Sequence, residues 1–286
     1  MGCALAIRCL IQWKDKALSI ELYNFSQSTC SIKVRLLLAE KKLPWIDKCL
    51  VSSENQHLSD WYLKLNPNGV VPTLIDGGQS IFESTAILEY LEDKYNKISF
   101  RPKDPYLCSQ VRAWLVFTDV WPTPAVRVPS FQYGGLREKF KVMSDQTFKA
   151  LMKKRPLKVE FYESFDKNDG FNLSEVYNSF KVLLRSFKRM ELLLEKFSGP
   201  WLFGKKYTIG DIAILPTVDR LEDLGFDALW RLAYPRVSDW LRNAQERNAT
   251  KKTFYHGSRL SHQFPNLVGG AGSNDKIVRE FLNSID

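Results

Sequence analysis

The sequence predicts two domains, an α/β domain at the N-terminus and an all-helical domain after it. Strand and helix patterns alternate in the first third of the chain, and no strand pattern recurs beyond it. Between the two parts, Pro102 and Pro105 break any regular element, which indicates a linker. The predicted division is an N-terminal extension, the α/β domain, the linker, the helical domain and a flexible C-terminal tail, over residues 1–17, 18–98, 99–105, 106–250 and 251–286.

The α/β part follows from alternation and from helix-breaking residues. Leu18–Phe25 alternates as a strand does, and the small polar residues after it suit a loop. A helical pattern then ends before Pro44, because proline disfavours helical backbone in the residue preceding it. The order β-α-β-α-β-β-α fits a thioredoxin-like sheet. Its first five segments, a strand, a loop, a helix, a strand and a short helix, cover residues 18–25, 26–31, 32–40, 45–52 and 60–65.

The stretch Asn66–Tyr95 carries the most specific pattern in the chain. A turn cluster leads into a β-branched strand, a tight reversal, a second strand and a helix. Pro72 cannot donate to a sheet ladder, so a proline here is a special feature. If Val71–Pro72 is cis, Val71 turns its own N–H and C=O toward an extended peptide. Glu83 and Ser84 at a helix start offer N–H groups and the positive end of the helix dipole to a carboxylate.

This combination resembles the glutathione site of glutathione transferases. The resemblance implies the glutathione transferase fold, with a thioredoxin-like domain before an all-α domain, and glutathione as co-substrate. It implies that Val71, beside Pro72, pairs with the cysteinyl backbone of glutathione, and that Glu83 and Ser84 hold its γ-glutamyl end. A homodimer is also implied, with helices around residues 84–95 and 106–120 at its interface.

The loop between the first strand and the first helix is expected to carry the chemistry. Hydroxyl donors and a helix N-terminus lower the pKa of a thiol below its usual value of about 8.5. In one chemistry, Ser28 or Ser31 donates a hydrogen bond to the thiolate of glutathione, which is the nucleophile. In the other, Cys30 is itself the thiolate and forms a mixed disulfide with glutathione. The residues leave both open.

Two groups of relatives are suggested by longer motifs. Tyr23–Leu36, YNFSQSTCSIKVRL, resembles tetrachlorohydroquinone reductive dehalogenase and the zeta-class maleylacetoacetate isomerases, which implies a catalytic serine at Ser28 and their cysteine at Cys30. Segments around Trp61, residues 101–105 and Met143 resemble bacterial glutathione-dependent β-aryl etherases, which cleave aromatic ethers by thiolate attack. The Ser-Thr-Cys-Ser loop departs from the etherases, so the reaction type stays open.

The helical half supplies candidates for the acceptor site and for folding. The substrate is expected to be a hydrophobic, aromatic electrophile. Thr208 and Asp211 form a capping-box variant at a helix start, a feature of glutathione transferases whose role is folding. Residues 156–170 are expected to be an irregular connection. Helices are predicted over residues 106–120, 143–155, 173–197 and 237–247. The aromatic candidates for the acceptor site are Trp114, Phe117, Trp121, Phe131 and Tyr133.

Composition excludes several other classes of function. The net charge of +9 is scattered and accompanies no nucleic-acid motif, and no apolar run is long enough for a membrane helix. The 5 cysteines form no paired or metal-binding spacing, which favours a reducing, cytoplasmic compartment and no metal.

Three functions remain: a transferase acting on aromatic electrophiles by ether cleavage or reductive dehalogenation, a zeta-type isomerase, and a non-catalytic binding domain. The intact motifs argue against the third.

Overall fold

The computed structural model describes residues 19–157 and 159–285. In this part of the chain, the N-terminal half forms a four-stranded sheet in the order β2-β1-β3-β4. β2 runs parallel to β1, whereas β3 and β4 form an antiparallel hairpin beside it, as the expected thioredoxin-like sheet requires. The strands are β1 (Ile20–Asn24), β2 (Trp45–Cys49), β3 (Thr73–Asp76) and β4 (Gln79–Phe82). The prediction for residues 1–17 lies outside the described residues.

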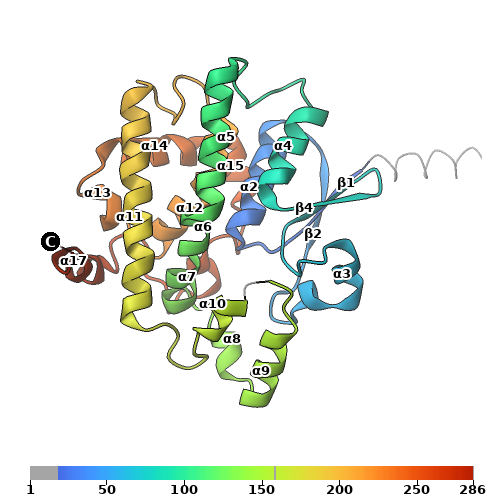
Figure 1. Cartoon of the computed structure of the whole chain (residues 1–286), viewed down its shortest axis with the longest axis vertical. Coiled ribbons are helices and arrows are strands. Elements are labelled where there is room, and N and C mark those ends of the chain that lie inside the picture. Colours follow the sequence, from blue (N-terminus) through green and yellow to red (C-terminus); the bar gives the residue numbers. More distant parts are fainter. Residues whose placement is uncertain (1–18, 158, 286) are drawn as a thin grey trace, which may run out of the picture.

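Helix α2 (Thr29–Glu40) is the element on which the two halves meet. It packs against α4 (Ser84–Lys94) beneath the sheet and against α12 (Ile209–Asp223) and α15 (Asn248–Thr253) of the helical half. Every residue from 31 to 38 is buried, including the consecutive Leu36, Leu37 and Leu38, so this part of the helix is covered on all sides. Figure 1 places α2 and α4 between the sheet and the helical half, and α3 (Asp60–Leu65) on the opposite side of the sheet.

The helical half contains the helices predicted from periodicity and several short ones. The two long helices, α5 (Pro105–Val120) and α11 (Leu173–Lys196), begin and end close to the predicted bounds. No helix in the described residues is long and apolar enough to cross a membrane. The remaining helices are α6 (Pro122–Ala125), α7 (Arg127–Tyr133), α8 (Glu138–Lys141), α9 (Asp145–Lys153), α10 (Val159–Glu163), α13 (Ala228–Arg231), α14 (Pro235–Glu246), α16 (Leu260–Gln263) and α17 (Asp275–Asn283), with the 3-10 turn η1 (Gln56–Leu58) in the first half.

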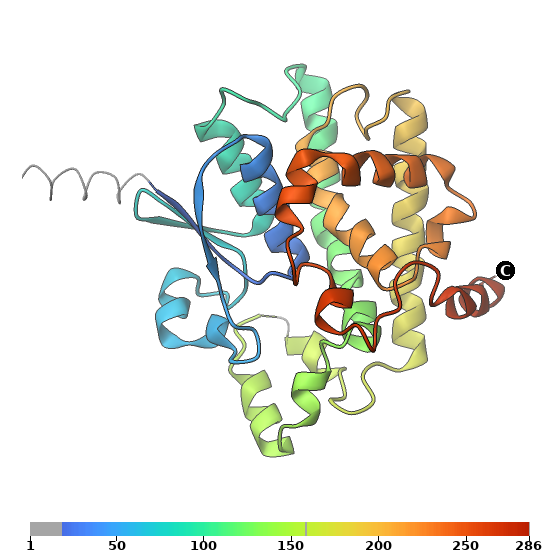
Figure 2. The ribbon, with the colours of Figure 1, turned by 180° about the vertical axis from the view of Figure 1, so that it is seen from behind.

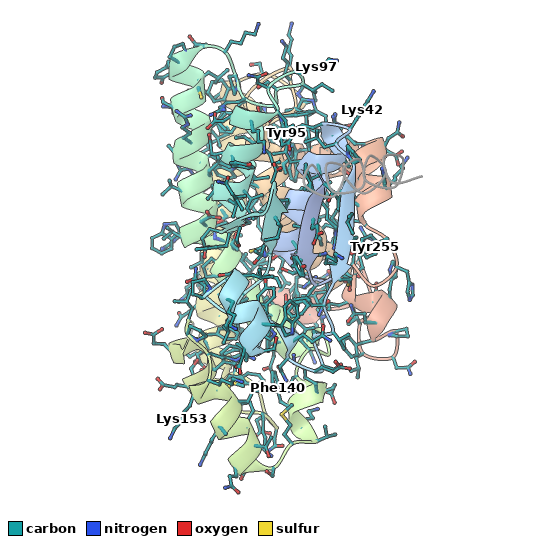
Figure 3. All side chains as sticks on the ribbon, turned by 90° about the vertical axis from the view of Figure 1, so that its right-hand side faces the viewer. Lys42, Tyr95, Lys97, Phe140, Lys153 and Tyr255 are labelled. Carbon is teal, nitrogen blue, oxygen red and sulfur yellow. The ribbon has the colours of Figure 1, made fainter. Side chains whose placement is uncertain are left out.

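The segment expected to be an irregular connection, residues 156–170, is part of a packed aromatic cluster and contains α10. Phe131 meets Phe161 and Phe165 edge to face, with ring centroids 5.3 and 5.6 Å apart, and Phe140 meets Phe165 at 5.8 Å. Such pairs stabilise beyond the area that they bury. Phe140 lies inside this part of the fold, whereas Lys153 on α9 points away from it (Figure 3).

The C-terminal segment, expected to be a flexible tail, is instead folded onto the body. Leu260, Val278 and Phe281 are fully buried, and Phe281 packs against Phe180 of α11. The glycine-rich turn brings the backbone close enough for Asn274 N–H to bond the carbonyl oxygen of Gly225 at 3.1 Å. Figure 2 shows this segment crossing from α15, beside α2, to α17 at the far side of the helical half.

The predicted capping box at the start of α12 is present and extends further into the core. The Asp211 carboxylate accepts hydrogen bonds from Thr208 N–H and Oγ1, both at 2.9 Å. It also accepts from Leu202 N–H at 2.9 Å and from Trp240 Nε1 at 2.8 Å, so one buried side chain joins three segments. The sequence showed the local pair but not the two distant donors.

Candidate active site

A cavity of about 450 Å³ lies between the sheet half and the helical half. This is within the usual range for small-molecule sites. From the first half it is lined by Phe25, Gln27, Ser28, Thr29, Cys30, Ser52, Ser53, His57, Gly69, Val70 and Val71. From the second half it is lined mainly by residues of α6 to α10, and Gln263 and Phe264 of the C-terminal segment complete it. The loop predicted to carry chemistry therefore opens into the same cavity as Val71.

Ser28 is the N-cap of α2, and its side chain lines the cavity. Its Oγ accepts a hydrogen bond from Ser31 N–H at 3.2 Å. A hydroxyl has one proton to donate besides the lone pairs with which it accepts, so this cap leaves the Ser28 proton available to a ligand. The first backbone hydrogen bond of α2 runs from Ile32 N–H to the carbonyl oxygen of Ser28. The N–H groups before Ile32 therefore have no carbonyl partner within the helix and point toward the loop.

The three candidates of this loop occupy different positions. Cys30 is a free, half-buried thiol that lines the cavity beside Ser28. Ser31 is fully buried, does not line the cavity, and its Oγ has no hydrogen-bond partner in the described residues. Thr29, which the sequence analysis did not single out, brings a further hydroxyl to the cavity wall. The structure thus brings Ser28 and Cys30 together and sets Ser31 aside.

The Val71–Pro72 peptide bond is cis, and Val71 lines the cavity. The turn before it is held from within, since Tyr62 Oη and Asn66 Nδ2 both donate to the carbonyl oxygen of Val70, at 2.8 and 2.9 Å. Asn66 Nδ2 also donates to Thr73 Oγ1 at 3.0 Å. The asparagine of the turn motif therefore fixes the backbone on both sides of Val71.

Glu83 and Ser84 stand at the start of α4 and do not line the cavity itself. The β3–β4 register pairs Thr73 with Phe82, which sets the next residue of each strand end, Pro72 and Glu83, side by side. Glu83 has φ of 68°, an unusual backbone angle for a residue with a side chain, and such angles concentrate at functional sites. The start of α4 therefore lies next to the cis-proline turn.

Arg35 ties the loop before α2 to the C-terminal segment. Its guanidinium is buried and donates to Asn24 Oδ1 at 2.6 Å, to the carbonyl oxygen of Ser26 at 2.7 Å and to Ser258 Oγ at 3.1 Å. It also donates to Tyr255 Oη at 2.8 Å and lies over that ring, and Figure 3 shows Tyr255 beside the sheet. No role for Arg35 could be predicted from the sequence, because two of its partners, Tyr255 and Ser258, lie more than 200 residues away along the chain.

Comparison with known proteins relates both halves to one superfamily. The N-terminal domain family model of glutathione S-transferases matches residues 27–94, and the C-terminal domain model matches residues 175–243. The crystal structure of the β-etherase LigF from Sphingobium sp. strain SYK-6 superposes with a TM-score of 0.75 at 28% identity, covering 83% of this chain and 99% of that one. The chain belongs to the glutathione S-transferase superfamily.

Two curated relatives agree with this assignment. Protein LigF of Sphingobium sp. is 28% identical over 248 residues, which cover 85% of this chain and 95% of LigF. A maleylacetoacetate isomerase of Dictyostelium discoideum is 29% identical over 199 residues, which cover 68% of this chain and 75% of the isomerase. The superfamily and the resemblance to etherases were both predicted from the motifs.

Of the five aromatic residues predicted for the acceptor site of this superfamily member, Phe131 lines the cavity and the other four do not. Trp114 is in the core, where its Nε1 donates to the carbonyl oxygen of Gly210 at 3.0 Å, and Phe117 stacks on it. Trp121 is 51% exposed. Tyr133 packs edge to face on Phe226, with centroids 5.1 Å apart. Trp114 and Phe117, the two members of the predicted helical stripe that lie inward, serve packing.

The apolar wall that faces the sheet half contains Phe131, one of the predicted residues, and apolar residues that the motifs did not single out. It is formed by side chains of the broken, proline-rich helices and of the C-terminal segment, where periodicity gives little signal. The apolar and aromatic lining residues that follow the sheet half in the chain are Val126, Phe131, Leu136, Leu157, Tyr162 and Phe264. Phe131 belongs to the aromatic cluster, so this wall is anchored from behind.

The charged side chains that line the cavity in the described residues are all cationic: Arg127, Lys139, Arg155 and Arg220. The guanidinium of Arg220 is already engaged within the fold, since it donates to the carbonyl oxygens of Gln27 and Ser258. Lys139 Nζ donates to the carbonyl oxygen of Ser52 at 3.0 Å. Burial, together with the charge of Arg155, lowers the pKa of Lys139 to about 8. The cavity is therefore suited to an anionic ligand.

Proposed function

We propose that the chain is a glutathione-dependent transferase in which Ser28 stabilises the thiolate of glutathione for attack on an aromatic electrophile. The observation that carries this proposal is the Ser28 hydroxyl, which lies at the N-terminus of α2 with its proton available and lines the same cavity as Val71. Its glutathione would lie against Val71, with the γ-glutamyl end toward Glu83 and Ser84. The cationic cavity suits the net negative charge of glutathione.

The reaction would proceed by substitution. Glutathione loses its thiol proton to solvent, and the Ser28 hydroxyl and the start of α2 stabilise the resulting thiolate. The sulfur attacks the carbon that bears the leaving group, so a C–S bond forms while a C–O or C–halogen bond breaks. An aryloxide or halide leaves, and an aryloxide takes up a proton. The apolar wall around Phe131 and Tyr162 would hold the aromatic body of the acceptor.

Cys30 supports a second chemistry at the same site, because its free thiol lines the cavity beside Ser28. Its thiolate would attack the sulfur of an aryl–glutathione conjugate. The C–S bond then breaks, the aryl carbon takes a proton, and Cys30 is left in a mixed disulfide with glutathione. A second glutathione would reduce this disulfide and release glutathione disulfide. This route converts substitution into reductive dehalogenation.

A third candidate is isomerisation, in which glutathione adds to the substrate and leaves again. The similarity to a maleylacetoacetate isomerase supports it, as does the serine–cysteine loop. Maleylacetoacetate, which carries two carboxylates, would also suit the cationic cavity. The product distinguishes an isomerase from a transferase, since isomerisation consumes no glutathione.

Mass spectrometry of protein and products distinguishes these chemistries. The wild type, Ser28→Ala and Cys30→Ser would each be incubated with glutathione and an aryl halide, a β-aryl ether or maleylacetoacetate. We expect free glutathione conjugate from the wild type and from Cys30→Ser, and little from Ser28→Ala. A glutathione adduct on Cys30, with the reduced arene lost in Cys30→Ser, would assign the dehalogenase route. Isomer formed without conjugate would assign the isomerase, and no product from any probe would contradict all three.

A further inference from the structure

Two of the cavity cations, Lys139 and Arg155, lie on the wall that the helical half contributes. Lys139 is in α8, and Arg155 follows α9. They are near enough for the charge of Arg155 to lower the pKa of Lys139. Two cations held close together repel each other, and burial increases that cost unless an anion lies between them.

Arg155 is buried but has no carboxylate partner in the described part of the chain. Its Nη1 lies 3.2 Å from His57 Nε2, and its guanidinium lies over the ring of Tyr162, 4.1 Å from the centroid. Because a guanidinium can only donate, this hydrogen bond requires His57 Nε2 to accept. Arg155 Nε is buried without a hydrogen bond in the described residues. The histidine and the ring hold the guanidinium in place without neutralising it.

Lys139 is held in a similar way. Its ammonium donates to the carbonyl oxygen of Ser52 and lies 4.9 Å from the centroid of the Phe140 ring. Its neighbour Glu138 is engaged elsewhere, in an ion pair with Lys141 at 2.7 Å. Lys139 therefore also lacks an anionic partner in the described residues, although it has donors left to offer.

The fully buried lysines of the described residues, unlike the half-buried Lys139, are neutralised. Lys33 pairs with Asp119 at 3.2 Å, and Lys41 pairs with Glu92 at 2.8 Å. Neither of them lines the cavity. In the described residues, the two lysines away from the cavity thus have carboxylate partners, whereas Lys139 and Arg155 on the cavity wall have none. A buried cation without a partner at a ligand-sized cavity indicates that the ligand brings the anion.

We propose that Lys139 and Arg155 together bind a carboxylate of a ligand in this cavity, an inference that rests on the proposed function for the identity of that ligand. Arg155 supplies the planar donor group and Lys139 a mobile point charge. The apolar wall beside them, which includes Leu136 and Tyr162, suits the apolar part of a ligand that carries the carboxylate. Two sources carry this chemistry: the glycine carboxylate of glutathione, and a carboxylate on the aromatic acceptor.

Matched ligands separate the two sources in equilibrium binding by calorimetry. The first pair is glutathione and its glycine ethyl ester, and the second is a chloronitrobenzoate and the corresponding chloronitrobenzamide. The variants are Lys139→Met, Arg155→Met and the double variant. Lys141→Met, on the same helix and in the exposed pair with Glu138, and Lys154→Met, an exposed neighbour of Arg155, are the controls.

Each single variant is expected to bind the carboxylate ligand roughly tenfold more weakly and its neutral analogue as the wild type does. Loss confined to glutathione would assign the glycine carboxylate, and loss confined to the benzoate would assign the acceptor. Arg155→Lys should restore part of the affinity, which a purely structural role would not predict. Equal affinities in all variants, equal loss of charged and neutral ligands, or no binding of any carboxylate by the wild type would overturn the proposal.

This test is separate from that of the proposed function. If the wild type binds the benzoate but neither glutathione nor its ester, the proposed transferase fails while the carboxylate site stands. If glutathione is bound and converted but no ligand distinguishes the variants, the transferase stands and the carboxylate site fails. Thermal unfolding of each variant confirms that binding is compared between folded proteins.

Discussion

Replacing Ser28 with alanine is expected to lower kcat for glutathione conjugation by roughly a hundredfold, the usual effect of removing one donor from a developing or resting anion. The Ser28 hydroxyl caps α2 through its lone pair and keeps its proton for the cavity. Alanine removes both interactions. The loss of the cap alone should reduce stability by about 1 kcal/mol, so activity is to be measured well below the unfolding midpoint of the variant.

Ser31→Ala is the matched control for this experiment. It removes an equal hydroxyl three positions later, on a side chain that is buried and outside the cavity. Its kcat should equal that of the wild type. Thr29→Val tests the neighbouring hydroxyl in the same assay. Full activity of Ser28→Ala together with inactivity of Thr29→Val would transfer the role to Thr29.

Replacing Asp211 with alanine is expected to lower the free energy of unfolding by about 3–5 kcal/mol. The carboxylate is fully buried and accepts from Thr208, Leu202 and Trp240, all of which lose their acceptor at once. Asn should be almost as damaging, because its amide group would face donors. Urea unfolding monitored by tryptophan fluorescence measures the change.

Asp145→Ala is the control for stability. Asp145 also stands in the first turn of a helix, α9, and pairs with Lys167, but its own side chain is 77% exposed. Its loss should change the free energy of unfolding far less than the loss of Asp211 does, because solvent screens an exposed pair. A change at Asp211 no larger than this would contradict the role that we assign to the buried carboxylate.

Features set by neighbours in the sequence could be predicted. The order of strands and helices, the turn before Pro72 and the Thr208–Asp211 box each depend on a few consecutive residues with strong conformational preferences. Ser28 and Cys30 follow from the same logic, because the end of a strand and the start of a helix fix the loop between them. Local signals of this kind survive packing.

Features that depend on packing could not be predicted from the sequence. Residues Ser31 and Cys30 are adjacent and polar, yet only one faces the cavity, and the sequence has no signal for which. Trp114 and Phe117 of α5 have the spacing of a binding face, but they pack in the core. The hydrogen bond from Trp114 Nε1 to the carbonyl oxygen of Gly210 shows this. The role of Arg155 depends on contacts with His57 that join distant segments. The fold of the C-terminal segment depends likewise on the body that it covers.

The claim that Ser28 and the start of α2 activate a thiol is tested most directly by titrating bound glutathione. The ultraviolet absorbance of the thiolate, followed against pH in the complex, gives the pKa of the bound thiol, with Cys30→Ser used throughout to exclude the protein's own thiol in this cavity. We predict a pKa clearly below the ordinary thiol value of about 8.5, rising toward that value when Ser28 is also replaced by alanine. An unshifted pKa in the bound complex, or the same lowered pKa with and without Ser28, would contradict the account.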